Sequence, residues 1–343
     1  VDMLSREEIL SAQEIYLNDD YLYILPSIEG TVYKLYPNLS WGTRENESFW
    51  HVWGCDPSLF VPISGENALK LIDEWELKIK EDHDRLSKAI IFATKKHNGQ
   101  FRKATTIPYI MHPLEVLQIL HSMKADTNLM IAGLLHDTVE DTDTTAEEIK
   151  ELFGDDVAAL VASHSEDKSK TWKERKEHTI KELAVASNRV KMLVLADKLS
   201  NLRSIAKDYN HIGDELWKRF NAPKEKQAWY YSNIQDALVN MQSFYACKEA
   251  YWEFVALFKD VFVKFFIDEE RKTLYQICED LNEGYYLEKG NPCWKSMNDT
   301  LNGLSEKGSI PHVFKLKSIP ETAIQIARNE AENIEDYWNE EIL

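Results

Sequence analysis

The sequence predicts a mainly α-helical protein, with a helical bundle at residues 75–245 between a small α+β segment at residues 1–74 and a helical extension at residues 246–343. Within the bundle region, apolar residues recur at spacings of three and four, which is the period of an amphipathic helix. Glycine is sparse there, as expected for long helices. Short aromatic stretches interrupted by proline and glycine occur in the first segment and favour strands there.

The first segment combines one predicted helix with short strands. SREEILSAQEIY begins with Ser5 three residues before Glu8, which is the capping-box spacing at the start of a helix. YLYILPS and TVYKLYP are rich in aromatic and β-branched residues, and Pro26, Gly30 and Pro37 interrupt them. The segment therefore resembles a small α+β unit, and its sequence indicates no role for it.

The middle segment is predicted to be a series of helices joined by loops. NGQFRKATTIPYIM contains Gly99 and Pro108 and is predicted to be a loop. TAEEIKELFG has Thr145 and Glu148 at capping-box spacing and ends at Gly154, a typical residue just after a helix. The other predicted helices are ENALKLIDEWELKIK, HDRLSKAIIFATKKH, HPLEVLQILHSM, NLMIAGLLHDTVED, WKERKEHTIKELAVAS and RVKMLVLADKLSNLRSIAKD.

Residues 246–343 are predicted to be mostly helical, with a loop around YLEKGNPCWKS. The stretch KEAYWEFVALFKDVFVKFF fits the bundle and the extension equally well, so the boundary between them stays open. No internal repeat is evident from the sequence. The extension, like the first segment, offers a surface for a second copy of the chain or for a protein partner.

The net charge of −18 limits the classes of binding partner. A field of that sign repels nucleic acids and anionic membranes, so neither is expected to bind. A small anionic substrate would need a local group of cations. HNGQFRK supplies such a group through Arg102 and Lys103, and Lys168 lies in a loop from which it can reach a phosphate.

The cysteines and the hydropathy pattern indicate a cytoplasmic protein. Cys55, Cys247, Cys278 and Cys293 form no C-x-x-C pair and are expected to be reduced thiols. No apolar stretch approaches the ~18 residues of a membrane span, and VDMLSREEIL lacks the apolar core of a signal peptide.

Residues 133–142, GLLHDTVEDT, place ionisable side chains at the end of an apolar run. His136 and Glu140 are four residues apart, as are Asp137 and Asp141, so each pair shares a helix face. Ionisable groups on a buried helix are costly unless they are paired, hydrogen-bonded or bound to a metal. The stretch is therefore a candidate metal site.

Two further candidate ligands lie at the ends of other predicted buried helices. His112 opens the helix after PYIM, and Asp197 follows the apolar run VKMLVLA. Taken alone, His112 is also explained as a helix cap, and Asp197 as the ion-pair partner of Lys198 or Arg203. A mixed set of imidazoles and carboxylates suits Mn²⁺, Fe²⁺ or Zn²⁺ better than an all-oxygen Mg²⁺ site.

HNGQFRKATTIPYIMHPLEVLQIL, GLLHDTVEDT and LVLADKLSNLRSI occur in this order, and together they resemble the HD-domain alarmone hydrolases. This family includes the hydrolase half of the RelA/SpoT enzymes and small stand-alone hydrolases, and the resemblance spans roughly residues 80–240. It implies an HD-domain helical bundle that removes the 3′-pyrophosphate of a hyperphosphorylated nucleotide such as ppGpp, in the stringent response.

The resemblance also implies a role for each motif residue. The metal, usually Mn²⁺, would be held by His112, His136, Asp137 and Asp197. Glu140 and Asp141 would activate or orient the attacking water. The nucleotide would be bound by Arg102, Lys103, Asn201 and Ser204.

The chain departs from the family pattern at two places. Ser200 replaces the histidine that usually precedes the asparagine of the third motif, so local hydrogen bonding must differ. ATTI replaces a tighter glycine-containing turn, so the base that the pocket accepts is undecided, and ppApp or the 2′-phosphate of NADPH are alternative substrates.

No stretch after residue 245 resembles the synthetase domain, which predicts a hydrolase only. The rival hypothesis is a non-catalytic, antitoxin-like nucleotide sensor that grips a partner protein through its termini.

Overall fold

The computed structural model divides the chain into two compact units, Val1–Lys88 and Ala89–Leu343. One long helix, α3 (Gly65–Lys96), begins in the first unit and ends in the second. The predicted segments 1–74, 75–245 and 246–343 remain a proposal for the functional domains. No helix in the described part of the chain is long and apolar enough to cross a membrane. The structure describes residues 3–18, 21–26, 31–45, 60–164, 168–281, 283–291, 293–297, 319–320 and 322–340.

The first unit is an antiparallel sheet with helices on one face. Helix α1 (Arg6–Leu10) starts at the predicted capping box of Ser5 and Glu8, but it ends earlier than expected because Glu14–Asn18 forms a strand. The strand order is β4-β3-β2-β1-β5, in which each strand of a four-strand meander pairs with the next and the last strand returns to pair with the first. The strands are β1 (Glu14–Asn18), β2 (Tyr21–Leu25), β3 (Thr31–Leu35), β4 (Trp41–Glu45) and β5 (Val61–Pro62).

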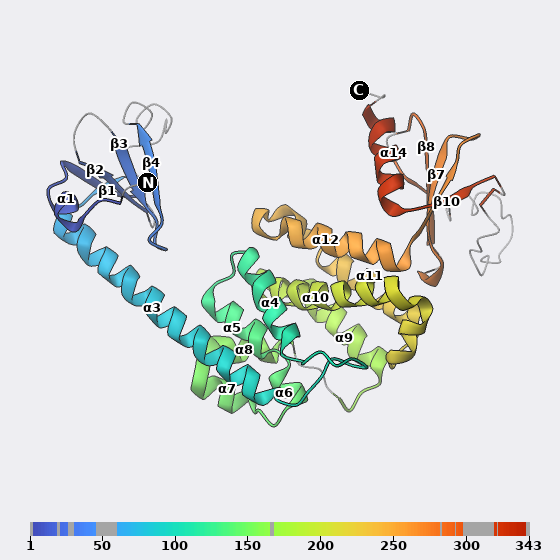
Figure 1. The fold of residues 1–343 in the computed structure, drawn as a ribbon, viewed down its shortest axis with the longest axis horizontal. Helices are drawn as coiled ribbons and strands as arrows, with labels where there is room; N and C mark the ends of the chain where they lie inside the picture. Colours follow the sequence, from blue (N-terminus) through green and yellow to red (C-terminus); the bar gives the residue numbers. More distant parts are fainter. Residues whose placement is uncertain are drawn as a thin grey trace. The chain divides into compact units, whose positions relative to one another are not determined.

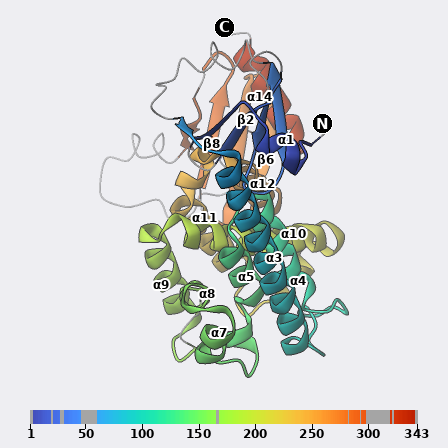
Figure 2. The same ribbon diagram turned by 90° about the vertical axis from the view of Figure 1, so that its left-hand side faces the viewer.

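The second unit begins with the predicted helical bundle, and Gln100–Ile110 forms the predicted loop between α3 and α4. Its longest helix, α10, is buried along most of its length because the run MLVLADKLSNL is apolar on nearly every face. Helices α4 and α5 lie side by side against α10, and α8 lies between α5 and α7 (Figures 1 and 2). The helices are α4 (Met111–Ser122), α5 (Thr127–Leu135), α6 (Thr138–Asp141), α7 (Ala146–Phe153), α8 (Asp155–Ala162), α9 (Trp172–Val185), α10 (Asn188–Ile212), η2 (Gly213–Arg219), α11 (Lys224–Ala237), η3 (Val239–Ser243) and α12 (Tyr245–Phe262).

The prediction of a helical C-terminal extension was confirmed only in part, because a second antiparallel sheet lies between its helices α12 and α14. Helix α12 packs on α10, but the chain then forms a second antiparallel sheet with the order β10-β6-β7-β8-β9. KFFID and TLYQIC are short runs rich in aromatic and β-branched residues, which favour strands, and most of their side chains are buried. The elements are β6 (Lys264–Asp268), β7 (Thr273–Cys278), η4 (Glu279–Leu281), β8 (Glu283–Glu288), β9 (Lys295–Ser296), β10 (Ile324–Ile326) and α14 (Arg328–Glu340).

The two sheets share one plan, which the sequence analysis did not detect. Each has a four-strand meander, then a short strand that pairs with the first strand, then a helix that packs on one face (Figure 1). β5 places Val61 opposite Leu17, and β10 places Ile324 opposite Ile267 in the same way. Ala68 and Trp75 on α3 have the same spacing as Ala331 and Trp338 on α14, and both pairs pack on their own sheet. The two sheets are therefore two versions of one module.

Equivalent positions also build the two module cores. Leu22 pairs with Leu35 in the first sheet, as Leu274 pairs with Leu287 in the second. Before the fourth strand, Asn38 accepts a backbone hydrogen bond from Ser40, and Asn291 accepts one from Cys293. A core tryptophan follows each turn, Trp41 or Trp294. The loops between the strands differ in length, so no constant offset relates the two stretches and the repeat is hidden in the sequence.

We expect Trp338→Ala to open the C-terminal sheet, because this largely buried indole joins α14 to the sheet core. Removing such a side chain costs about 3 kcal/mol. Hydrogen exchange measured by mass spectrometry should show faster exchange in β6, β7 and β8. Tyr337→Ala is the matched control, because the neighbouring ring is 57% exposed. Equal exchange in the two variants would contradict a core role for Trp338.

Candidate functional site

The apolar run of α5 delivers His136 and Asp137 to a buried point. The predicted single helix is interrupted there: α5 ends at Leu135, and α6 starts at Thr138. Gly133 allows α5 to lie close to α4, since a Cβ at this position would stand 2.3 Å from Leu120 Cδ1. This close approach brings the ring of His136 to 5.2 Å from that of His112, measured between ring centroids.

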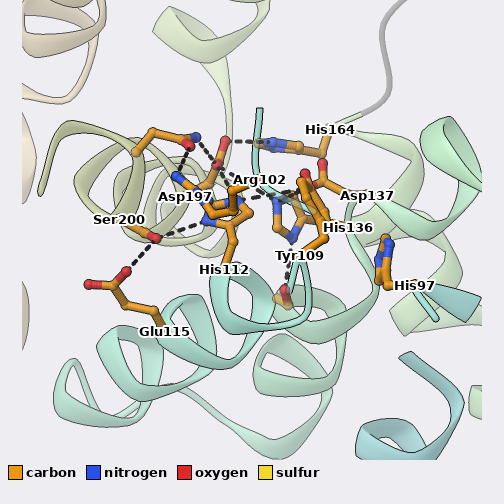
Figure 3. A network of polar contacts seen from close by, with 12 residues as sticks. His97, Arg102, Tyr109, His112, Glu115, His136, Asp137, His164, Asp197 and Ser200 are labelled. Atoms are coloured by element: carbon orange, nitrogen blue, oxygen red, sulfur yellow. Dashed lines mark hydrogen bonds and ion pairs between the residues drawn. The ribbon is translucent and has the colours of Figure 1, made fainter. Parts of the chain in front are cut away.

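Three helices bring the four predicted ligands together, with His112 on α4 and Asp197 on α10 (Figure 3). His136 Nε2 lies 3.0 Å from Asp137 Oδ2 and 3.7 Å from Asp197 Oδ1. His112 Nε2 lies 3.6 Å and 3.2 Å from the same two oxygens. The four side chains thus converge through their Nε2 and carboxylate atoms, although they come from three motifs that are more than 20 residues apart in the chain.

The hydrogen bonds of both imidazoles leave their inner nitrogens suited to a metal. His136 Nδ1 donates to the Gly133 carbonyl oxygen at 2.8 Å, so the neutral ring carries its lone pair on Nε2. His136 Nε2 is buried and makes no hydrogen bond. A buried nitrogen without a hydrogen-bond partner beside two carboxylates is the environment of a cation ligand, and the donor set fits a divalent transition metal.

The electrostatics of the cluster favour two ionised carboxylates. Burial alone would raise the pKa of Asp137, but positive charge on the neighbouring imidazoles, chiefly His136, outweighs burial and lowers that pKa; a cation bound in place of the imidazole proton would act in the same sense. Burial acts on Asp197 in the same sense, yet the Lys198 ammonium and the histidines hold its pKa well below the usual value. The site therefore presents two negative charges to a cation.

Three residues that sequence reasoning did not assign to the site lie within it. The Tyr109 hydroxyl donates to Asp137 Oδ2 at 2.5 Å. His164 Nε2 lies 2.9 Å from Asp197 Oδ2, and Lys198 Nζ lies 2.7 Å from the same oxygen. With His136 and Asp197, His164 forms a second group of side chains that could hold a metal ion. The order of residues in the chain gave no signal for His164, whereas Lys198 directly follows Asp197 and Tyr109 lies three residues before His112.

The contacts of Asp197 and His112 go beyond an ion pair and a helix cap, the simpler explanations of these two residues. Asp197 does pair with Lys198, but it also faces both histidines, so the ion pair does not account for the cluster. Arg203 pairs instead with Glu115 and Glu253. His112 lies at the start of α4, yet no side chain caps that helix.

A cavity of about 340 Å³ adjoins the cluster. Tyr109 and Lys198, which contact Asp137 and Asp197, also line the cavity, so the cluster and the cavity are adjacent. Its wall carries cations and aromatic rings, and among the described residues that line it the one acidic side chain, Asp208, is paired with Arg219 at 2.8 Å. The lining includes the cations Arg102, Lys103, Lys176, Lys198 and Arg219 and the rings of Trp172, Phe220, Tyr230 and Tyr231.

All four residues expected from the resemblance to bind nucleotide line this cavity, namely Arg102, Lys103, Asn201 and Ser204. Arg102 Nη2 donates to Asn201 Oδ1 at 3.3 Å, and Asn201 Nδ2 donates to Asp197 Oδ1 at 2.6 Å. Through these two hydrogen bonds, a cation of the cavity wall is connected to a predicted metal ligand.

The remaining predicted residues lie on or beside α6. Glu140 is half-buried and Asp141 is exposed. Lys168 Nζ donates to the Glu140 carbonyl oxygen at 2.5 Å and lies 3.4 Å from Asp141 Oδ1. Lys168 is outside the group of described residues that line the cavity, so the predicted phosphate contact would require its side chain to leave α6.

Comparison with known proteins adds an independent observation. The family model described as "HD domain" matches residues 89–222. A protein of Danio rerio, guanosine-3′,5′-bis(diphosphate) 3′-pyrophosphohydrolase MESH1, is 42% identical over 135 residues, which cover 38% of this chain and 73% of the relative. The human protein of the same name is 41% identical over 136 residues, covering 39% of this chain and 74% of the relative.

Longer relatives match through a smaller part of their length. The guanosine-3′,5′-bis(diphosphate) 3′-pyrophosphohydrolase of Aquifex aeolicus is 34% identical over 216 residues, which cover 61% of this chain but only 29% of that protein. The match therefore spans less than a third of the long relative and most of the short ones. Together with the converging motif residues, these similarities show that the chain belongs to the HD-domain family of MESH1- and SpoT-type ppGpp hydrolases.

Proposed function

We propose that this protein is a metal-dependent phosphohydrolase that removes the 3′-pyrophosphate from a hyperphosphorylated nucleotide such as ppGpp. The observation that carries the proposal is that the buried His/Asp cluster lies directly beside the cation-lined cavity, with Tyr109 and Lys198 shared between them. A chain of net charge −18 repels an anionic nucleotide in general, so a local group of arginines and lysines beside the cluster needs a specific purpose. Relatives of this chain carry the name of that activity, and the HD-domain model matches residues 89–222, which include this cluster.

We assign the cation to His112, His136, Asp137 and Asp197, with Mn²⁺ as the proposed ion and another divalent transition metal as the alternative. The chemistry that such an ion supplies is polarisation of phosphoryl oxygens and production of hydroxide at neutral pH. Asp137 and Asp197 offset its charge, and Tyr109 fixes the orientation of Asp137 through its hydroxyl. The tautomer of His136, set by the Gly133 carbonyl oxygen, keeps Nε2 available.

The chain's own groups supply the remaining steps. Arg102 and Lys103 bind phosphoryl oxygens and offset the negative charge that develops on them. Asn201 and Ser204 orient the sugar and base region, and Trp172 or Phe220 offers an aromatic surface for the base. Glu140, with Asp141 beside it, orients the attacking water and accepts its proton on a carboxylate oxygen.

The substrate is left wider than ppGpp alone, and a rival function is kept. Thr105 of the ATTI loop lines the cavity, so the loop that departs from the family pattern bears on the base. ppApp and the 2′-phosphate of NADPH therefore remain alternative substrates, and a non-catalytic sensor remains the rival function. We further propose that the chain only degrades, that it acts in the cytoplasm, and that its terminal modules bind a second copy or a protein partner.

Turnover by metal-restored protein tests this function. The protein is stripped of metal, supplied with Mn²⁺ and offered ppGpp, ppApp and NADPH in parallel. We expect Mn²⁺-dependent release of pyrophosphate from ppGpp, and no release by Asp137→Ala, because the ion would lose one of its two proposed carboxylate ligands. Asp143→Ala is the matched control, since that carboxylate is exposed. Bound metal and bound nucleotide without release from any of the three compounds would support the sensor instead.

Glu140→Gln tests the proposed role of Glu140. An amide cannot accept the proton of water, so kcat should fall by roughly 10²–10⁴-fold. Because Glu140 is outside the predicted ligand set, Mn²⁺ affinity measured by titration calorimetry should stay at the wild-type value. Full activity in this variant would remove Glu140 from the mechanism and leave Asp141 as the candidate.

A further inference from the structure

The imidazole of His112 is the inner end of a continuous chain of hydrogen bonds that leads away from the site. His112 Nδ1 lies 2.8 Å from Ser200 Oγ, and Ser200 Oγ lies 2.8 Å from Glu115 Oε2 (Figure 3). A carboxylate only accepts, so the Ser200 hydroxyl must donate to Glu115. The Ser200 oxygen then accepts from His112 Nδ1–H, and the lone pair of His112 is on Nε2, toward Asp137 and Asp197.

The outer half of the chain is ionic and reaches α12. Arg203 Nη1 donates to Glu115 Oε1 at 3.0 Å. The same guanidinium donates through Nε and Nη2 to the two carboxylate oxygens of Glu253, each at 2.7 Å. This bidentate geometry is specific to arginine, whose donors form a rigid fork. Glu253 belongs to α12, so an element of the predicted C-terminal extension is connected to the metal cluster.

Burial decides which links are indispensable. Ser200 is 0% and His112 is 3% exposed, so water cannot take over a missing bond at the inner end. An imidazole N–H left without an acceptor there would be costly, and the ring would turn to find another. The side chains of Arg203 and Glu253 are 37% and 41% exposed, so solvent can partly replace their ion pair. The inner links should therefore matter more than the outer one.

We propose that Ser200, Glu115, Arg203 and Glu253 are positioning residues that fix the tautomer and orientation of His112, so that α12 contributes to the affinity of the site for its cation. Ser200, which replaces the histidine usual at this position in the family, thereby has a defined task in this chain. The inference rests on the proposed function only in requiring that the site binds a metal.

Metal affinity measured without nucleotide tests the proposal. We expect Ser200→Ala to weaken Mn²⁺ binding by about 10–100-fold, as loss of an outer partner of a metal-ligating histidine does elsewhere. Ser200→Thr keeps the hydroxyl and should restore most of the affinity. Glu253→Gln should weaken binding by a smaller factor, and Glu249→Gln, an exposed change on the same helix, should have no effect. Titration calorimetry and the electron paramagnetic resonance signal of free Mn²⁺ provide the readouts.

The outcomes separate this inference from the proposed activity. Weaker Mn²⁺ binding by Ser200→Ala, with rescue by Ser200→Thr, supports the positioning role even if no nucleotide is hydrolysed. Wild-type affinity in folded Ser200→Ala overturns it even if ppGpp is hydrolysed, and so does the absence of Mn²⁺ binding by the wild-type protein. If Ser200→Ala does not fold, Glu115→Gln takes its place, because it keeps the side-chain volume while removing the charge; wild-type affinity in that variant overturns the inference.

Discussion

The burial of two imidazoles against two carboxylates, where α4, α5 and α10 meet, is the constraint on which the rest of this site depends. Charged groups out of contact with water must be paired, hydrogen-bonded or bound to a cation. The surroundings provide this neutralisation from several directions: Tyr109 for Asp137, and Lys198, His164 and Asn201 for Asp197. After these contacts, the inner nitrogens of the histidines remain directed at the carboxylates. The packing of α5 on α4 at Gly133 makes this arrangement possible, because a larger residue would separate the two rings.

The distribution of charged side chains also accounts for the character of the cavity beside the cluster. In a protein with 58 acidic and 40 basic residues, several basic side chains gather on one wall, and the acidic residue among them is paired. A wall of this kind attracts phosphate while the rest of the surface repels it, which favours a small anionic ligand over a polymer. Aromatic rings on the same wall add a surface on which a planar base can stack.

The two terminal sheets have the same plan but different places in the chain. They share strand order, the return of a short last strand to the first strand, and a helix whose alanine and tryptophan pack on the sheet. The first belongs to residues 1–88 and the second follows α12, the helix that holds Arg203 through Glu253. The second module continues along the chain directly from α12, the helix that contributes Glu253.

The sequence by itself determined the helical bundle, the loop before His112 and four side chains that converge, because helical periodicity and short motifs are local properties. It did not reveal the break of the helix at His136, the C-terminal sheet or the repeated module. Short apolar runs such as KFFID are compatible with either helix or strand, and only pairing with distant strands decides between them. The contacts of His164, Ser200 and Glu115 at the site likewise depend on segments that are distant in the chain. Their importance arises from packing between helices that are far apart in the chain, and only the tertiary structure brings those helices together.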